Sequence, residues 1–397
     1  MADRGTVRTM DFSVSSEQRL LLDTIERFVT EELVPLETGI ENSGVLADGA
    51  AREVFRKSRA LGLYATNIPE ALGGGGLSAV ETCMVEERQG WTSDILIRRA
   101  FGNVYEALLE CRDAQIERWL KPCVRGERTC SIAITEPGAG SDAASISTRA
   151  VRDGDGWVLD GAKHFVSDGA FSDFYLVSAV TDPETRGISI FLVDRDQPGV
   201  TVGRDQPMMG LRGTSHVELS FDGVRLGHEQ LLGDEGKGLR LILTTLGRVR
   251  LAHVGARAVG KAVRAMKMMT DYANDRRQFG RSIGDNQMIQ AMIADSATEI
   301  EAARLMVLRA AWELDQGRDA RTEIAMVKVY ATEVLGRVVD RCVQIHGGMG
   351  YCKDLEVERL YRDARIFRIY DGTSEIHRLS VAKDVLSGRW TGGLTRV

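Results

Sequence analysis

Hydrophobic residues recur along the chain first with a helical period, then with a strand period, and then with a helical period again. This pattern predicts an α+β fold with three domains. We expect a helical N-terminal domain at residues 1–129, a middle β domain at 130–237 and a helical C-terminal domain at 238–397. A chain of 397 residues is long enough for two or three domains of ordinary size.

Two long helices are predicted in the C-terminal segment. Apolar residues at helical spacing extend from Ile289 to Val307 and from Ile324 to Val338. The second pattern stops at Gly347-Gly348, where glycine favours a helix end. Long helices with short connections indicate an antiparallel bundle. Near the N-terminus, Ser15-Ser16-Glu17-Gln18 has the form of a capping box, which predicts a helix start.

Alternation of apolar with small or polar residues predicts the strands of the middle domain. It is seen at Ile188, Ile190 and Leu192, and again from Val217 to Phe221. The segment Asp153-Gly154-Asp155-Gly156 has the composition of a hairpin turn. We therefore expect a β domain of about a hundred residues.

Composition excludes several classes of protein. The net charge is −6 with both signs interspersed, which argues against a nucleic-acid binder. No run of 18 apolar residues predicts a membrane span, and the first ten residues lack the apolar core of a secretory signal. The six cysteines show no CxxC pair and are expected to be buried free thiols, and no histidine has metal-ligand spacing. We expect a cytoplasmic protein, or an organelle-matrix protein in a eukaryote.

The segment with the most suggestive chemistry is Ile369-Tyr370-Asp371-Gly372-Thr373-Ser374-Glu375-Ile376-His377. It predicts a bend at Gly372 followed by a helix whose N-cap is Thr373 or Ser374. Asp371 would then lie beside backbone N–H groups that can hold an oxyanion. A carboxylate in that position suits removal of a proton α to a carbonyl. The alternative is a solvated aspartate that caps a turn.

Two glycine-containing loops are candidate phosphate or cofactor sites. The first is Ala133-Ile134-Thr135-Glu136-Pro137-Gly138-Ala139-Gly140-Ser141-Asp142, which is rich in potential N–H donors. A polar turn explains its composition equally well. The second, Gly73-Gly74-Gly75-Gly76, lacks the lysine of a P-loop, and an inter-helix loop explains it better.

Four short motifs together resemble the acyl-CoA dehydrogenase family. They are Thr135 to Asp142, Arg276-Arg277-Gln278-Phe279-Gly280, Gln344-Ile345-His346-Gly347-Gly348 and Asp371-Gly372-Thr373-Ser374, in the family's order and at its separations. The resemblance covers nearly the whole chain. It implies that the middle domain is a β-barrel or sandwich, that the C-terminal domain is a four-helix bundle, and that the cofactor is FAD.

The resemblance also implies which residues would contact the flavin. One group would run along the cofactor, with Thr135 bonding the ring and Ser141 between flavin and CoA: Ile132, Ala133, Ile134, Thr135, Gly140 and Ser141. A second group is Phe165, Val166 and Ser167, where the family usually has Trp-Ile-Thr. Phe165 would cover the ring face, and Ser167 would bond near flavin N5.

A third group would reach the dinucleotide of a neighbouring subunit, as expected for a homo-oligomer of the dimer-of-dimers type. It comprises Arg276, Gln278, Phe279, Asn286, Gln287, Gln344, Ile345, Gly347 and Gly348. Arg276 suits this role because a guanidinium binds pyrophosphate in a bidentate manner, although a surface ion pair would also account for it. Thr373 and Glu375 would contact the cofactor at the start of the last helix.

The family's mechanism agrees with the interpretation of the Asp371 turn. FAD accepts hydride from the β-carbon of an acyl-CoA thioester while a carboxylate takes the α-proton, and a backbone N–H at the base position holds the thioester oxygen. The usual base is glutamate, so Asp371 reaches about 1.5 Å less, the length of one C–C bond. Tyr370 and Gly372 would flank the substrate.

Arginines near this site are further candidates for substrate binding. Arg248 and Arg250 lie near the position of an arginine that is usual in the family, while the ungapped match falls on Leu251. A solvated helix face is the alternative for both. Arg98 and Arg99 fall in the segment that resembles the pocket floor, where they would bind a polar or carboxylated acyl chain or pair with Glu106 or Glu110.

The leading functional hypothesis is an FAD-dependent acyl-CoA dehydrogenase with Asp371 as base and an electron-transferring flavoprotein as electron acceptor. A nitroalkane oxidase, a relative that also uses aspartate at this position and needs no CoA, is the second hypothesis. A non-catalytic flavin-binding subunit is the third. The sequence does not distinguish among acyl chains.

Overall fold

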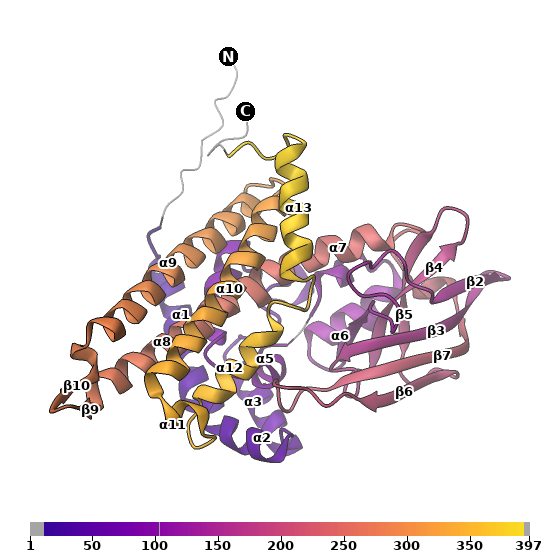
Figure 1. The fold of residues 1–397 in the computed structure, drawn as a ribbon. Coiled ribbons are helices and arrows are strands. Elements are labelled where there is room, and N and C mark those ends of the chain that lie inside the picture. Colours follow the sequence, from indigo (N-terminus) through magenta and orange to yellow (C-terminus); the bar gives the residue numbers. More distant parts are fainter. Residues whose placement is uncertain (1–11, 103, 393–397) are drawn as a thin grey trace.

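A computed structural model describes residues 12–102 and 104–392, in which helices pack against one side of a sheet (Figure 1). The N-terminal part is helical and has its own apolar core around Ile25, Leu33 and Leu96. Its helices are α1 (Ser16–Phe28), α2 (Glu37–Ser43), α3 (Asp48–Ala60), α4 (Ala79–Gln89), α5 (Asp94–Phe101) and α6 (Lys121–Val124). Helix α1 begins with the predicted capping box at Ser15.

The middle part is one sheet with the strand order β6-β7-β3-β2-β4-β5-β8, and β1 pairs in parallel with β4. The strands are β1 (Cys130–Ala133), β2 (Arg149–Asp153), β3 (Gly156–Ser167), β4 (Phe174–Asp182), β5 (Gly187–Asp194), β6 (Val200–Asp205), β7 (His216–Leu226) and β8 (Leu231–Leu232). The predicted hairpin joins β2 to β3, with Asp153 opposite Gly156. The middle β domain is therefore confirmed, and its strands form an open sheet.

The C-terminal part is a helical bundle with its own core around Val259, Val307 and Val338. Its elements are α7 (Gly238–Val249), α8 (Arg257–Asp275), β9 (Arg277–Gln278), β10 (Arg281–Ser282), α9 (Gln287–Asp315), α10 (Arg321–His346), α11 (Gly348–Tyr351), α12 (Val357–Ile366) and α13 (Ser374–Leu386). Helices α8, α9 and α10 run side by side, and α13 packs against α10 (Figure 1). The predicted end of α10 at Gly347 is confirmed.

A π-helical turn at Arg250–Ala256 joins α7 to α8. Each π turn accommodates one residue more than an α turn and therefore shifts the register of the side chains that precede it.

Some expectations need correction or lie outside the described residues. Five cysteines are buried and Cys352 is exposed, and all six are free thiols. Residues 1–10, on which the absence of a secretory signal was predicted, are not described. No helix within residues 12–102 and 104–392 is both long and apolar enough to cross a membrane.

Candidate active site

The turn between α12 and α13 places Asp371 at the centre of the site. Asp371 has a positive φ of 54° and Gly372 a φ of 91°, so the chain reverses sharply before α13. A Cβ at Gly372 would lie 2.8 Å from His377 Nε2, which leaves room only for glycine. Thr373 is the N-cap, as predicted, and its Oγ1 accepts from the Ile376 amide at 3.2 Å.

Two side chains hold the main chain of this turn through the Asp371 carbonyl oxygen. Arg250 Nε donates to it at 2.7 Å, and His377 Nε2 lies 3.1 Å from it. Within the described residues, the amides of Asp371 and Gly372 have no acceptor, and no side chain bonds the Asp371 carboxylate. The turn therefore presents a carboxylate and free N–H donors together.

Burial raises the pKa of Asp371, while Arg250, Lys328 and Arg98 act in the opposite direction. A raised pKa makes the carboxylate a stronger base while it remains ionised. Tyr370, which precedes it, is partly buried and packs edge-on against Phe367 at 5.4 Å between ring centroids.

Of the nearby arginines, Arg250 reaches the main chain of Asp371. It contacts the Asp371 carbonyl, whereas Leu251, the ungapped match to the family's usual arginine, is 1% exposed in the bundle core. Arg250 is the first residue of the π turn. Arg248, the other candidate, is exposed on α7.

The predicted flavin loop follows β1 and is fixed by a buried ion pair. Glu136 accepts from Lys163 Nζ at 2.7 Å and from the Ser147 and Thr148 amides at 2.6 and 3.0 Å. Lys163 also donates to the Ile134 carbonyl at 3.2 Å. Burial would raise the pKa of Glu136, but these donors outweigh it and lower that pKa to about 2. The loop is thus held in one conformation from inside.

The end of β3 presents the second group of predicted flavin contacts. Phe165 has a positive φ of 55°, is 49% exposed and stacks on His164 with 3.9 Å between centroids. Val166 is buried in the sheet core, so only its backbone can face a cofactor. Ser167 Oγ lies 3.1 Å from His216 Nδ1.

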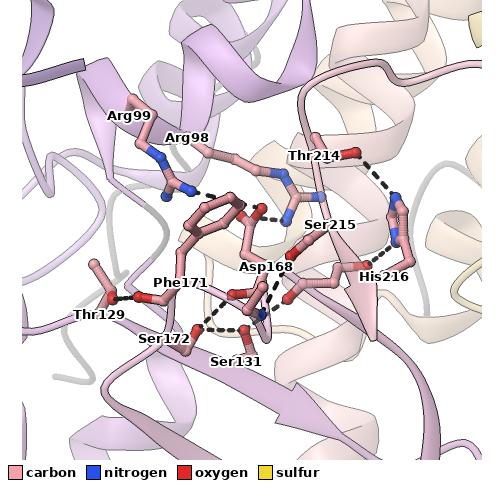
Figure 2. Close-up of polar contacts among 12 residues, drawn as sticks. Arg98, Arg99, Thr129, Ser131, Asp168, Phe171, Ser172, Thr214, Ser215 and His216 are labelled. Atoms are coloured by element: carbon pink, nitrogen blue, oxygen red, sulfur yellow. Dashed lines mark hydrogen bonds and ion pairs between the residues drawn. The ribbon is translucent and has the colours of Figure 1, made fainter. Parts of the chain in front are cut away.

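Arg98 and Arg99 pair with Asp168 rather than with Glu106 or Glu110 (Figure 2). Arg98 Nη1 lies 3.1 Å from Asp168 Oδ2, and Arg99 Nη2 lies 4.0 Å from Oδ1. Asp168 follows β3 in the left-handed conformation, with φ of 58°, which turns its carboxylate toward α5. Burial would lower the pKa of Arg98, but Asp168 outweighs it and raises that pKa.

The third group of predicted cofactor residues lies at the end of the bundle that is distant from the sheet in Figure 1. Arg276, Gln278, Phe279, Asn286 and Gln287 surround the β9–β10 hairpin, and Phe279 is fully exposed. The end of α10, with Gln344, Ile345, Gly347 and Gly348, is beside it, because His346 stacks on Tyr272 of α8 at 4.3 Å. Ile345 itself is buried.

Sequence reasoning missed Lys163, Asp168 and Lys328. Asp168 directly follows a predicted flavin contact, which could have singled it out. Lys328 lies four residues after Ile324 on the apolar face of α10, and a charged residue on a buried stripe is a signal worth noting. Lys163 gives no comparable signal within its strand.

The residues present fit an FAD. A Cβ at Gly138 or Gly140 would meet nothing within 4 Å, so that face of the loop is open. Ser141 is exposed and Thr135 partly exposed beside it. With the exposed Phe165 ring, they offer donors and an aromatic face to a flavin.

A helical domain, a sheet and a helical bundle follow one another, with an open loop that fits a flavin and a partly buried acid, which is the arrangement expected of a flavin-dependent oxidoreductase. Residues 15–127, 131–224 and 236–386 match the family models of the acyl-CoA dehydrogenase N-terminal, middle and C-terminal domains. The chain belongs to the acyl-CoA dehydrogenase family, which is FAD-dependent and acts on acyl-CoA.

Several family members are similar over nearly the whole of this chain. (R)-Benzylsuccinyl-CoA dehydrogenase of Thauera aromatica is 36% identical over 95% of this chain and 97% of its own length. A caffeyl-CoA reductase–Etf complex subunit of Acetobacterium woodii is 36% identical over 92% of this chain and 96% of its own. The solved acyl-CoA dehydrogenase complexed with FAD from Bacillus anthracis gives a TM-score of 0.86 at 30% identity, covering 96% of this chain and 69% of that one.

Proposed function

We propose that this protein oxidises an acyl-CoA thioester to the 2-enoyl-CoA, with Asp371 removing the α-proton. The observation that carries the proposal is the carboxylate just before α13. In residues 12–102 and 104–392 no side chain bonds it, and the two amides beside it have no acceptor. When bound, FAD supplies the acceptor for the β-hydride.

Asp371 would act through both its side chain and its backbone. Its carboxylate takes the α-proton as the hydride leaves, so the substrate loses one proton and one hydride and gains one double bond. The Asp371 amide donates to the thioester oxygen and stabilises the negative charge that develops there. Arg250 and His377 keep this amide in place by holding the Asp371 carbonyl.

The shorter base requires a closer substrate. An aspartate reaches about 1.5 Å less than a glutamate, so the α-carbon would lie nearer to the turn than in relatives with glutamate. The positive φ of Asp371 and the hydrogen bond from Arg250 to its carbonyl would hold the turn in one conformation. A shorter base needs this, because its carboxylate must be placed accurately against the α-carbon.

Partners follow from the same family. We propose that an electron-transferring flavoprotein reoxidises the cofactor, as the name of the Acetobacterium woodii relative suggests for its own complex. We also propose a dimer of dimers in which the β9–β10 end of one chain reaches the FAD of its neighbour. Sedimentation equilibrium of the holoenzyme tests this, and a monomer that retains FAD would exclude it.

Anaerobic bleaching of bound FAD by straight, branched, cyclic and dicarboxylic CoA thioesters tests the function. We expect one class to bleach the flavin, and Asp371→Asn to slow bleaching by at least about 100-fold with FAD still bound. Asp371→Glu is the matched control, because it retains a carboxylate and should bleach faster than the asparagine variant. If Asp371→Asn bleaches at the wild-type rate, the base is another group.

A nitroalkane oxidase would instead form peroxide from a nitroalkane and ignore CoA. The same preparation distinguishes the two enzymes. A protein that binds FAD but responds to neither substrate would be the non-catalytic alternative.

A further inference from the structure

Lys328 of α10 is buried behind the Asp371 turn with no partner for its charge. Its side chain is 0% exposed, and Nζ has no hydrogen-bond partner within the described residues. Nζ lies 6.0 Å from the centroid of the Tyr370 ring, the residue that precedes Asp371. Burying an ammonium without a hydrogen bond is costly, so its presence requires an explanation.

The charged groups around Lys328 are Asp371, Arg250, Glu333 and Glu375. Glu333 is already paired with Arg368 at 3.2 Å and with Arg378 at 3.5 Å. The Glu375 side chain is 76% exposed, so water screens it. Asp371 is therefore the one of these carboxylates that is neither paired nor screened.

The charged and titratable groups around Asp371 also indicate that Lys328 acts on Asp371. Arg250 and His377 are bonded to the Asp371 carbonyl oxygen, and Arg98 is paired with Asp168. Arg250, which acts most strongly, and Lys328 are therefore the two cations that act on the carboxylate without a carboxylate partner of their own among the described residues. Burial lowers the pKa of Lys328 to about 8, and the nearby Asp371 opposes this, so Lys328 is charged near neutral pH.

We propose that Lys328 is a positioning residue whose charge, together with that of Arg250, keeps the partly buried Asp371 carboxylate ionised and ready to accept the α-proton. This rests on the proposed function and deepens it. Lys328 keeps its own proton throughout. One proton would move from the substrate α-carbon to Asp371, and FAD would take up the hydride lost from the β-carbon, so no reactant beyond substrate and cofactor is needed.

The pH dependence of FAD bleaching in Lys328→Met tests the proposal. An opposite charge at this range lowers a carboxyl pKa by about one unit or more, so its loss should move the acid limb upward by about one pH unit. The variant should then bleach about tenfold more slowly than wild type below that limb and at the wild-type rate above it. An acid limb at the wild-type position would overturn the proposal.

Two matched variants separate charge from packing. Lys328→Arg keeps the charge and should keep the acid limb at the wild-type position, even if its larger side chain slows bleaching at every pH. Lys267→Met removes an exposed lysine of α8, whose side chain is 59% exposed, and should leave the limb and the rate unchanged. FAD content is measured for each variant.

A second measurement does not depend on activity. Thermal unfolding of the holoenzyme at pH 7 is compared for wild type, Asp371→Asn, Lys328→Met and the double variant. Removing the Asp371 charge should raise Tm more when Lys328 is also absent, because the buried carboxylate then has one cation fewer. Equal rises in the two backgrounds would show that the residues are not coupled.

The two measurements distinguish the possible failures. If no CoA thioester bleaches wild-type FAD, the proposed function fails, and the unfolding cycle still decides whether Lys328 acts on Asp371. If wild type bleaches and Lys328→Met keeps the wild-type acid limb, only the role of Lys328 fails.

Discussion

Two buried lysines, Lys163 in the sheet and Lys328 in the bundle, are both 0% exposed, but their surroundings differ. Lys163 donates to Glu136, to the Ile134 carbonyl and to Ser178, so all three of its N–H groups have acceptors. Among the residues that the structure describes, Lys328 has no acceptor. Burial lowers the pKa of both to about 8.

The difference separates a structural charge from a functional one. The Lys163–Glu136 pair fixes a loop in one conformation, which needs complete hydrogen bonding. Lys328 can stabilise the Asp371 carboxylate electrostatically only if no other acidic group pairs with its ammonium. A buried ammonium without a hydrogen bond, near a carboxylate that no side chain pairs with, is therefore the pattern expected of a catalytic site. Such sites keep poorly solvated charges because the reaction uses them.

The largest expected effect is the loss of stability when the Lys163–Glu136 ion pair is broken. Glu136→Gln leaves Lys163 buried without a counter-charge and should lower the free energy of unfolding by about 3–5 kcal/mol. Urea unfolding followed by circular dichroism measures this. Glu184→Gln, at an exposed turn, is the control and should change stability by less than about 0.5 kcal/mol.

A double variant sharpens that result. Glu136→Gln with Lys163→Met removes both charges and should recover part of the lost stability. If Glu136→Gln is as stable as wild type, the pair does not hold the loop.

The second prediction compares the two lysines directly. Lys163→Met leaves the Glu136 carboxylate with one charged donor fewer and should cost about 1.5–3 kcal/mol. Lys328→Met removes a buried charge that has no hydrogen bonds, so unfolding should require as much free energy as in wild type, or more. The same urea titrations measure both. If both variants lost the same unfolding free energy, Lys163 and Lys328 would not differ in their contribution to stability.

Local sequence signals predicted the parts of the fold that depend on neighbouring residues. The end of α10 at Gly347, the β2–β3 hairpin and the Thr373 cap each arise from a few consecutive residues, and all are confirmed. The Asp371–Gly372 bend follows from the same kind of signal, because only glycine accommodates the turn at position 372.

Contacts between distant segments could not be predicted in this way. Arg98 and Asp168 are 70 residues apart, and their pairing depends on a left-handed turn after β3. The π turn at Arg250 has no sequence signature that a helical period reveals, so Arg248 and Arg250 could not be told apart. Lys328 Nζ lacks a hydrogen bond because none of the described helices around it places an acceptor within reach, which no local sequence pattern shows.

The smallest expected effect is a pH dependence of stability that arises at Glu136. Its pKa of about 2 in the folded protein lies below the ordinary value of 4.5, so the unfolded chain binds a proton first as the pH falls. The contribution is complete above the unfolded-state pKa and is lost as the pH falls through the folded-state pKa. Between pH 6 and pH 4 this should remove about 1 kcal/mol of stability.

Because other carboxylates titrate in the same range, the measured quantity is the difference in unfolding free energy between wild type and Glu136→Gln at each pH. That difference should shrink by about 1 kcal/mol from pH 6 to pH 4, since the variant has no group to titrate at this position. The Asp371 carboxyl behaves oppositely, because burial raises its pKa, so the advantage of Asp371→Asn over wild type should fall as the pH is lowered. If the Glu136 difference stays constant over this range, Lys163 and the loop amides do not hold the carboxylate in its ionised form.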